Sequence, residues 1–352
     1  MEPPSAARSS LLGENRRRRS PPGRVFARLR EPWTDRQAAW RLGAVACLVL
    51  LIIVLMVVFV AVRAWPVLQA NGWISWLGPG GDIDHQLGQM IATGQHPPDS
   101  AYHLRAWPLI YGTLLTTGVS VLVGLVFSLL AAIFIVEFAP ARIRAVVVPA
   151  VRLLAAVPSV IYGLIGILVL APAVGSHLIS PDRKHSVQNV VQIDGTGVLV
   201  AVAVLTVMIT PIMIAIVVDA LRAIPPAWTE GAAALGANRW EVVWSVSVRA
   251  TRPAIVAAAV LACARALGEA VALSMVSGSR GFSPNPADGI TYLFEPIRPL
   301  AASMVENVDA INAPPVRASI YAFALLLLLS SLALSVGGYV AKLPMRRQGL
   351  RV

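Results

Sequence analysis

Residues 198–218 read VLVAVAVLTVMITPIMIAIVV, which is twenty-one consecutive residues without a charged side chain. An α-helix needs about 20 predominantly apolar residues to cross the roughly 30 Å hydrocarbon core of a bilayer. This stretch therefore predicts a membrane-spanning helix. The composition of the 352-residue chain agrees, because 57% of its residues are hydrophobic and 13% are charged, against about 45–50% and about 25% in soluble domains. These values exclude a water-soluble enzyme.

Five further apolar runs are long enough to cross a membrane. The chain is thus predicted to be an all-α integral membrane protein with six transmembrane helices, the other five lying at 42–62, 112–136, 146–174, 253–277 and 318–341. The first run follows a long polar segment and exceeds the apolar part of a signal peptide, so we expect a retained helix. The third contains Pro158 near its middle. A helix broken by proline is tolerated in lipid beside neighbouring helices or a cavity, so this helix is predicted to line a pore.

The distribution of Lys and Arg predicts the orientation in the plasma (inner) membrane. Of these 29 residues, twenty lie on the side that holds both chain ends and the connection 219–252, and seven lie on the other side. Cytoplasmic loops carry an excess of Lys and Arg, so both termini are expected in the cytoplasm. The predicted organisation is a disordered basic tail at 1–41, the first helix and an external loop at 42–108, a five-helix core at 109–341 and a second tail at 342–352. The first tail is expected to be mainly a topology signal, with attachment to anionic membrane lipids as the alternative.

The cytoplasmic connection 219–252 is too regular for a simple linker. Pro225, a possible cap at Thr229 and the following Gly236 are typical of the start and stop of a short helix. Beyond it, Trp240, Val243, Trp244, Ser247 and Val248 recur with the period of an amphipathic helix. We therefore expect a helix-turn-helix at the membrane surface.

The first of these segments resembles the EAA motif of ABC importer permeases. The resemblance is carried by the pattern Glu-x-Ala-x-x-x-Gly at 230–236, namely Glu230, Gly231, Ala232, Leu235 and Gly236. It implies a coupling helix that docks into a groove of a separate ATPase subunit, a recognition mode suited to a helix with a small-residue face and one charged anchor. Gly231 stands where that family usually has Ala. An ordinary interfacial helix is the alternative.

Two charged residues fall inside the predicted fifth helix. Arg265 is the twelfth residue after Pro253, which places it about 18 Å along the helix and near the bilayer midplane. Glu269 follows at i+4 on the same helix face, so the two can neutralise each other. Ionisable residues at this depth are costly and usually functional. Their arrangement predicts a path for an anion, with a buried ion pair that only fixes helix packing as the alternative.

The stretch around this pair resembles the fifth helix of phosphate-specific ABC importer permeases, the PstC-type subunit more than its PstA-type partner. Three segments carry the resemblance, RALGEAVALSMV at 265–276, EFAP at 137–140 and VPSVIYG at 157–163. It covers about residues 109–340 and implies a MetI-like type I permease fold and phosphate as substrate. The implied partners are a homologous PstA-type permease, an ATPase dimer and an external phosphate-binding protein.

The hydroxyls of Ser159 and Tyr162 lie beside the predicted break at Pro158. Together with the backbone donors that a broken helix exposes, they are suited to bind an oxyanion. Alternatively, both hydroxyls satisfy the backbone of the broken helix itself.

Several kinds of chemistry find no support in the sequence. No GxxxxGK[ST] phosphate loop occurs, so ATP is expected to be used by a partner subunit and not by this chain. The five histidines are scattered without the spacing of metal ligands, and neither a metal, a resident cofactor, a catalytic residue nor a nucleic-acid partner is expected. The open alternatives are a permease for another oxyanion such as molybdate or sulfate, an ion-gradient-driven anion carrier and, with least support, an intramembrane enzyme.

Overall fold

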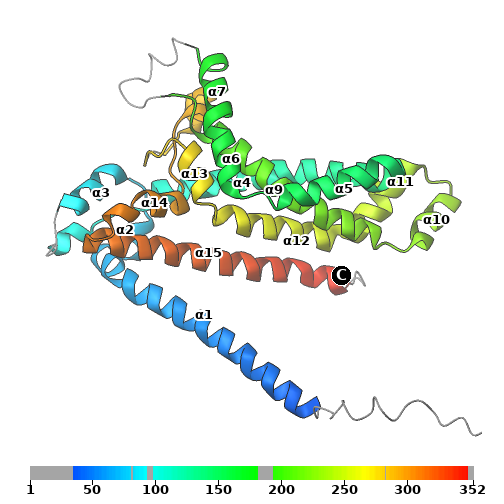
Figure 1. Cartoon of the computed structure of the whole chain (residues 1–352), viewed down its shortest axis with the longest axis horizontal. Helices are drawn as coiled ribbons and strands as arrows, with labels where there is room; N and C mark the ends of the chain where they lie inside the picture. The colour runs from blue at the N-terminus through cyan, green and yellow to red at the C-terminus, as the bar shows by residue number, and fades with distance from the viewer. Residues whose placement is uncertain (1–34, 81, 93–97, 181–192, 282, 348–352) are drawn as a thin grey trace, which may run out of the picture. The chain divides into compact units, whose positions relative to one another are not determined.

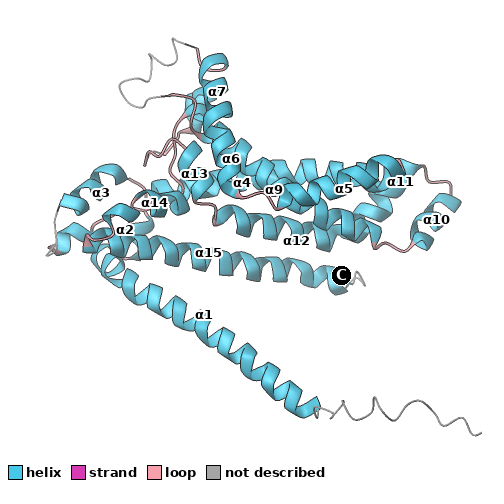
Figure 2. Cartoon of the chain, viewed as in Figure 1, coloured by secondary structure: helices cyan, strands magenta, loops and turns pink. Residues whose placement is uncertain are grey.

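The computed structural model describes residues 35–80, 82–92, 98–180, 193–281 and 283–347. In this part of the chain the secondary structure is helical, without a strand (Figure 2). The chain divides into two compact units, residues 1–56 and 57–352, with the boundary inside the first helix, α1 (Asp35–Asn71). Residues 35–41, predicted as the end of a disordered tail, form the first turns of α1, and residues 1–34 lie outside the described part.

Six helical runs are long and apolar enough to cross a membrane, which confirms the predicted number. Their bounds are Ala39–Asn71, Trp107–Phe138, Ser159–His177, Val198–Arg222, Arg239–Leu267 and Pro314–Ala341. Four of them correspond to the predicted runs with extended ends, whereas the third and the fifth differ in a way that changes the architecture.

The prediction of one long third run at 146–174 is wrong. A separate helix, α5 (Ala141–Ala155), precedes the third span, which consists of α6 (Ser159–Ile165), the π-helical turn η4 (Gly166–Leu170) and α7 (Ala171–His177). Pro158 has φ −58° and ψ 138° and directly precedes α6. A proline also disfavours helical geometry in the residue before it, which explains why the chain leaves the helix at 156–158. Pro158 therefore lies at one end of this span and not in its middle.

The fifth span begins earlier than predicted and ends earlier too. α11 (Arg239–Val242), the π-helical turn η5 (Val243–Ser247) and α12 (Val248–Leu267) form one continuous helical run. The expected second surface helix, from Trp240 onward, is therefore the start of this span, because no residue between it and the apolar run breaks the helix. A capping box, in which the side chains of Asn238 and Glu241 bind each other's backbone N–H groups, starts the run.

The first surface helix is α10 (Pro226–Ala234). Its N-cap is Pro225, so the expected cap at Thr229 is wrong, and the Thr229 hydroxyl instead donates to the carbonyl of Pro226. Gly236, with φ +90°, ends the segment in the left-handed conformation that glycine adopts without strain.

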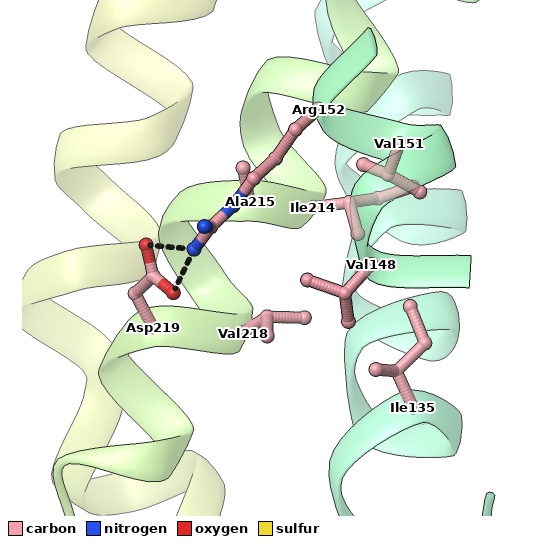
Figure 3. A pocket seen from close by; sticks show the side chains of 8 residues that line it. All are labelled: Ile135, Val148, Val151, Arg152, Ile214, Ala215, Val218 and Asp219. Carbon is pink, nitrogen blue, oxygen red and sulfur yellow. Dashed lines mark hydrogen bonds and ion pairs between the residues drawn. The ribbon is translucent and has the colours of Figure 1, made fainter. Parts of the chain in front are cut away.

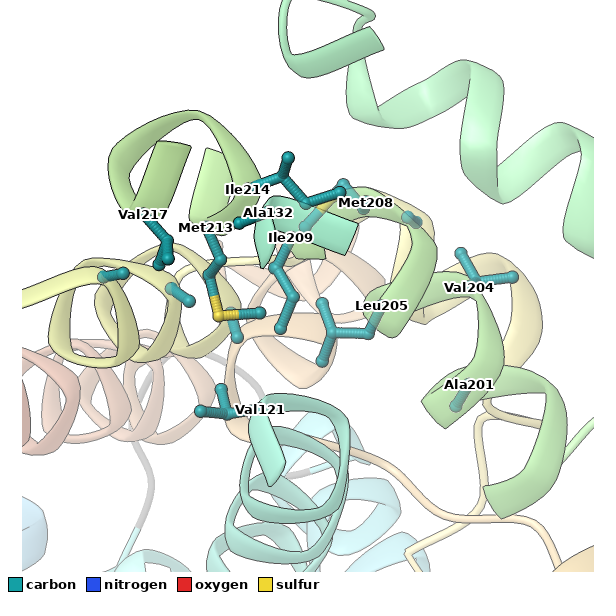
Figure 4. Packing of buried hydrophobic residues seen from close by; sticks show 14 of the residues in the cluster. Val121, Ala132, Ala201, Val204, Leu205, Met208, Ile209, Met213, Ile214 and Val217 are labelled. Atoms are coloured by element: carbon teal, nitrogen blue, oxygen red, sulfur yellow. The ribbon is translucent and has the colours of Figure 1, made fainter. Parts of the chain in front are cut away.

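The main core is built around α9 (Val198–Arg222). Of its most apolar stretch 61% is buried, against 17% in α15 (Pro314–Arg347). α4 (Trp107–Ile133), α5 and α12 pack against α9 (Figure 1). Figure 4 shows the side chains of Leu205, Ile209 and Met213 of α9 and that of Val121 of α4 in this cluster. α9 is thus the helix that organises the others.

A second cluster joins the outer segments. The rings of Trp76, on α2 (Trp73–Leu77), and Phe323, on α15, stack with centroids 6.5 Å apart. Met90 of α3 (Ile83–Ala92) and Val67 of α1 are buried with them. The remaining short elements are η2 (Asp99–Tyr102), η3 (Phe134–Phe138), α13 (Val271–Val276), η6 (Pro286–Phe294), α14 (Leu300–Glu306) and η7 (Val308–Ala310).

Small residues allow α6 and α13 to approach closely. A Cβ atom added to Gly163 would lie 2.8 Å from the Cα of Ala272, and one added to Gly166 would lie 2.6 Å from a methyl carbon of Val276. Real Cβ contacts are longer than this, so only glycine fits at these two positions. Such close packing through small residues is the usual means of joining helices in a membrane.

We predict that Gly163→Ala destabilises the protein by about 1–3 kcal/mol through overpacking. Gly118→Ala is the matched control, because nothing lies within 4 Å of a Cβ at Gly118 and alanine favours a helix over glycine by about 0.5–1 kcal/mol. The measurement is the thermal unfolding midpoint of the detergent-solubilised protein. Equal midpoints for the two variants would contradict the described contact between α6 and α13.

Candidate functional site

Two helix breaks lie beside a pair of closely packed short helices. One break, at residues 156–158, separates α5 from α6, and the other, at 268–270, separates α12 from α13. α6 and α13 pack against each other directly after these breaks (Figure 1). Broken helices leave backbone groups without their helical partners, and in a membrane these groups need partners supplied by the protein. The side chains near the breaks must therefore be assigned one by one.

Tyr162 provides one such partner. Its hydroxyl donates a hydrogen bond of 2.9 Å to the carbonyl of Leu154, in the last turn of α5. The side chain thus bridges the break at Pro158, in line with the alternative in which the hydroxyl satisfies the broken helix. Ser159 is the first residue of α6 and is half-buried.

Glu269 provides the second partner, and it does so without Arg265. Its Oε1 accepts a hydrogen bond of 3.1 Å from the N–H of Ala272, in the first turn of α13, and the residue is 7% exposed. No ion pair joins Glu269 to Arg265 in the described part of the chain. The expectation that the two share a helix face fails because α12 ends at Leu267 with Gly268 as its cap.

Arg265 is consequently left with unused donors. It lies in the last turn of α12, is half-buried, and its buried Nε has no hydrogen-bond partner among the residues that the structure describes. It is near enough to the Tyr162 hydroxyl for an electrostatic interaction. A guanidinium presents a planar fork of N–H donors that matches an oxyanion. Arg265 and Tyr162 thus lie beside the two breaks, Tyr162 just after the first and Arg265 just before the second, while Glu269 is engaged by the N–H of Ala272.

The segments around α3, α13 and α14 contain an ion network that the sequence does not predict. Arg298 lies 2.5 Å from Asp84 of α3 and 2.7 Å from Glu306 of α14, measured between the paired nitrogen and oxygen atoms. Ser279, just after α13, donates to Glu306 at 2.6 Å, and the N–H of Gly281 donates to Asp84 at 3.0 Å. These contacts tie α3, α14 and the end of α13 together. Asp84 is 214 residues from Arg298, and the segment from Arg298 to Glu306 is not one regular helix, so residue spacing does not predict the network.

Burial dominates the electrostatics of Glu306 in this network. It raises the pKa of Glu306 above its ordinary value of 4.5, and the Asp84 carboxylate acts in the same direction. The hydrogen bond from Ser279 and the charge of Arg298 lower the pKa in part. The cluster thus holds a carboxyl group that ionises less readily than one in water.

On the side opposite to these segments, α10 exposes the residues of the EAA-like motif. None of its side chains is buried, and Leu235 is 92% exposed. Glu230, Gly231 and Ala232 lie within the helix, whereas Leu235 and Gly236 form its end and the following turn. A short exposed helix of this kind is suited to insertion into a groove of another protein.

Near this end of the core, Arg152 of α5 pairs with Asp219 of α9. The two groups are 3.1 Å apart at the edge of a small pocket lined by apolar side chains of both helices (Figure 3). Its volume of about 10 Å³ admits about one water molecule, so it is not a substrate site. Both side chains are more than half exposed, and such ion pairs contribute about 0–1 kcal/mol.

Comparisons with known proteins agree on the type of molecule. Residues 124–343 match the family described as "Binding-protein-dependent transport system inner membrane component". The phosphate transport system permease protein PstC 1 of Mycobacterium tuberculosis is 32% identical over 280 residues, which cover 77% of this chain and 81% of that protein. The probable phosphate transport system permease protein PstC of Methanocaldococcus jannaschii is 31% identical over 235 residues, covering 66% and 70%.

A solved structure supports the same fold. A bacterial alginate ABC transporter, in complex with an alginate pentasaccharide-bound periplasmic protein, contains a chain that superposes with a TM-score of 0.54. The superposition covers 90% of this chain and 98% of that one at 14% identity, so it concerns the fold alone.

The six spans and the family match together identify a multi-pass membrane permease, which is a transport subunit. More narrowly, the chain belongs to the family of binding-protein-dependent transport system inner membrane components, with the MetI-like fold of ABC importer permeases.

The raised pKa of Glu306 predicts a pH dependence of stability. Between pH 4.5 and the raised pKa the folded state binds more protons than the unfolded state, so the free energy of unfolding falls as the pH rises through this window and is constant above it. Glu306→Gln is expected to remove this slope. The measurement is the thermal unfolding midpoint from pH 4 to 8 for both proteins. Parallel curves would show that Glu306 is not the responsible group.

Proposed function

We propose that this chain is the transmembrane permease subunit of an ATP-driven ABC importer that moves inorganic phosphate into the cell. Phosphate is suggested by the names of the relatives, which are phosphate transport system permeases. The observation that carries the proposal within this chain is Arg265, a half-buried cation whose Nε is buried and has no hydrogen-bond partner among the described residues. An unpaired buried donor is costly, and a passing oxyanion would satisfy it.

The substrate path follows from this position. Phosphate would accept hydrogen bonds from the Arg265 guanidinium and from Ser159 and Tyr162 at the start of α6, after displacement of the Tyr162 hydroxyl from the carbonyl of Leu154. Glu269 holds the first turn of α13 in place through the N–H of Ala272 and takes no direct part in binding. Its negative charge close to the path would also prevent an anion from remaining bound.

The energy would come from a partner, because this chain lacks a phosphate loop for ATP. The proposed complex consists of this chain, a homologous PstA-type permease, two ATPase subunits and an external phosphate-binding protein. α10 is the proposed coupling helix, with Glu230 and the small residues Gly231 and Ala232 against the ATPase groove. Both termini lie in the cytoplasm in this proposal, on the side with the excess of Lys and Arg.

A permease for molybdate or sulfate would have the same fold and the same cationic site, and competition by these anions in an uptake assay distinguishes it. An ion-gradient-driven carrier would require neither an ATPase nor the exposed helix α10, and membership of the importer family argues against it.

The proposal is tested first by uptake of radiolabelled phosphate into phosphate-starved cells with and without this gene, before and after collapse of the proton gradient at constant ATP. We expect uptake to fall on deletion and the gene-dependent part to survive collapse of the gradient. A strain without paralogous phosphate transporters is the appropriate host. Unchanged uptake on deletion in that strain would refute phosphate as the substrate.

A second prediction concerns the site itself. Arg265→Gln is expected to abolish gene-dependent phosphate uptake while the complex still assembles in the membrane, because the cation for the oxyanion is lost. Arg249→Gln, on the same helix α12 but exposed, is the matched control and is expected to retain uptake. The measurements are initial uptake rates and co-purification of the partner subunits. Normal uptake by the assembled Arg265→Gln protein would exclude this residue from the path.

A further inference from the structure

Two π-helical turns lie against each other at the end of the bundle that carries α10. One is η3 (Phe134–Phe138), which ends α4, and the other is η5 (Val243–Ser247), which precedes α12. In η3 the N–H of Ala139 donates to the carbonyl of Phe134, five residues earlier, at 2.7 Å. π-turns are rare, and they are frequently found at functional sites. Two of them in contact therefore require an explanation.

The contacts of η3 with η5 and with the preceding α11 involve the segment EFAP, which the resemblance singled out but the proposed transport site leaves unexplained. The hydroxyl of Ser247 donates to Glu137 Oε1 at 3.3 Å, and the guanidinium of Arg239 donates to the carbonyl of Glu137. The same guanidinium lies 5.1 Å from the centre of the Phe138 ring, within the range of a cation–π interaction. The ring of Trp240 lies 6.2 Å from that of Phe138.

Arg144 of α5 completes the junction from the other side. It donates to the carbonyls of Ile135, Val136 and Ala139, which the end of the helix leaves without helical partners. The end of α4 is therefore held by an arginine on each side, Arg144 from α5 and Arg239 from the start of the fifth span. A bound guanidinium can follow a carbonyl through a small displacement, whereas the backbone hydrogen bonds of a regular α-helix cannot rearrange without breaking.

The junction is connected directly to α10. α10 contacts both α11 and η5, and the turn at Gly236 and the capping box at Asn238 fix its position relative to Arg239. A displacement of α10 would therefore also displace Arg239, Trp240 and Ser247. Through Glu137 and Phe138 it then reaches α4, which packs along α9, the central helix of the core.

We propose that Glu137, Phe138 and Arg239 are positioning residues that transmit movement of the coupling helix α10 to α4, with the two π-turns as the deformable elements. This inference rests on the proposed function of the chain in an ATP-driven importer. It extends that function by assigning a second route from the ATPase contact into the core, in addition to the continuous helix from Arg239 to Leu267.

The test uses the complete importer in liposomes, with phosphate uptake and ATP hydrolysis measured on the same preparation. Phe138→Leu is expected to retain ATP hydrolysis and to lower phosphate uptake per ATP by about five- to tenfold, the low end of measured coupling free energies. Phe138→Tyr keeps the ring and is expected to restore the ratio. Phe127→Leu is the matched control, because Phe127 is on the same helix and 59% exposed, and its ratio is expected to equal that of the wild type.

Arg239→Lys is the second variant, which keeps the charge but loses the planar fork, and it is used if Phe138→Leu does not assemble. An unchanged ratio of uptake to hydrolysis in an assembled variant would overturn the inference. A proportional loss of both activities would also overturn it, because that is the effect of a purely structural residue. A wild-type importer without ATP-dependent phosphate uptake would instead refute the proposed function.

Discussion

The structure depends on how a helix can be interrupted in an apolar solvent. Within hydrocarbon no water is available to an unpaired N–H or carbonyl group, so each interruption must be satisfied by the protein. The interruptions after α5 and α12 lie at ends of the third and fifth spans, and one side chain serves each: Tyr162 donates back to Leu154, and Glu269 accepts from Ala272. The two short helices that follow are held together by contacts that only glycine permits. The arginine before the second break keeps a buried Nε that has no hydrogen-bond partner in the described part of the chain.

The same requirement explains the contrast between the two ends of the bundle. At the end that carries α3 and α14, neighbouring segments are joined by ion pairs centred on Arg298. At the end that carries α10, the carbonyls of η3 are held by Arg144 and Arg239. Arginine supplies several donors in a fixed geometry and stays charged, so it can satisfy groups that come from different helices. The number of arginines on each side predicts the orientation of the chain in the membrane. Individually, these arginines join groups that belong to different helices.

Much of the fold could be predicted from the sequence, because crossing a membrane imposes a length and an apolar composition. The number of spans and the isolated helix α10 follow from apolar runs and from the signals at Pro225 and Gly236. The start of the fifth span could not be found in this way, since an amphipathic segment from Trp240 onward has the same periodicity at a surface as at the beginning of a span. The third span is shorter than the apolar run predicts, because the apolar residues continue across Pro158 whereas the helix is interrupted there.

The residues of the candidate site could be predicted from the sequence, but their hydrogen bonds could not. The surface helix α10 likewise depends on contacts that its own sequence does not determine. On a regular helix the spacing would place Glu269 on the same face as Arg265, but α12 ends at Leu267, so the two residues do not share a helix face. α10 has nine residues and buries none of its side chains. Isolated helices shorter than about 12–15 residues are marginal in water, because nucleation is unfavourable and few turns follow it. The stability of helix α10 therefore depends on the groups that contact it. A partner that covers its exposed face would also set the fraction of time for which this segment is helical.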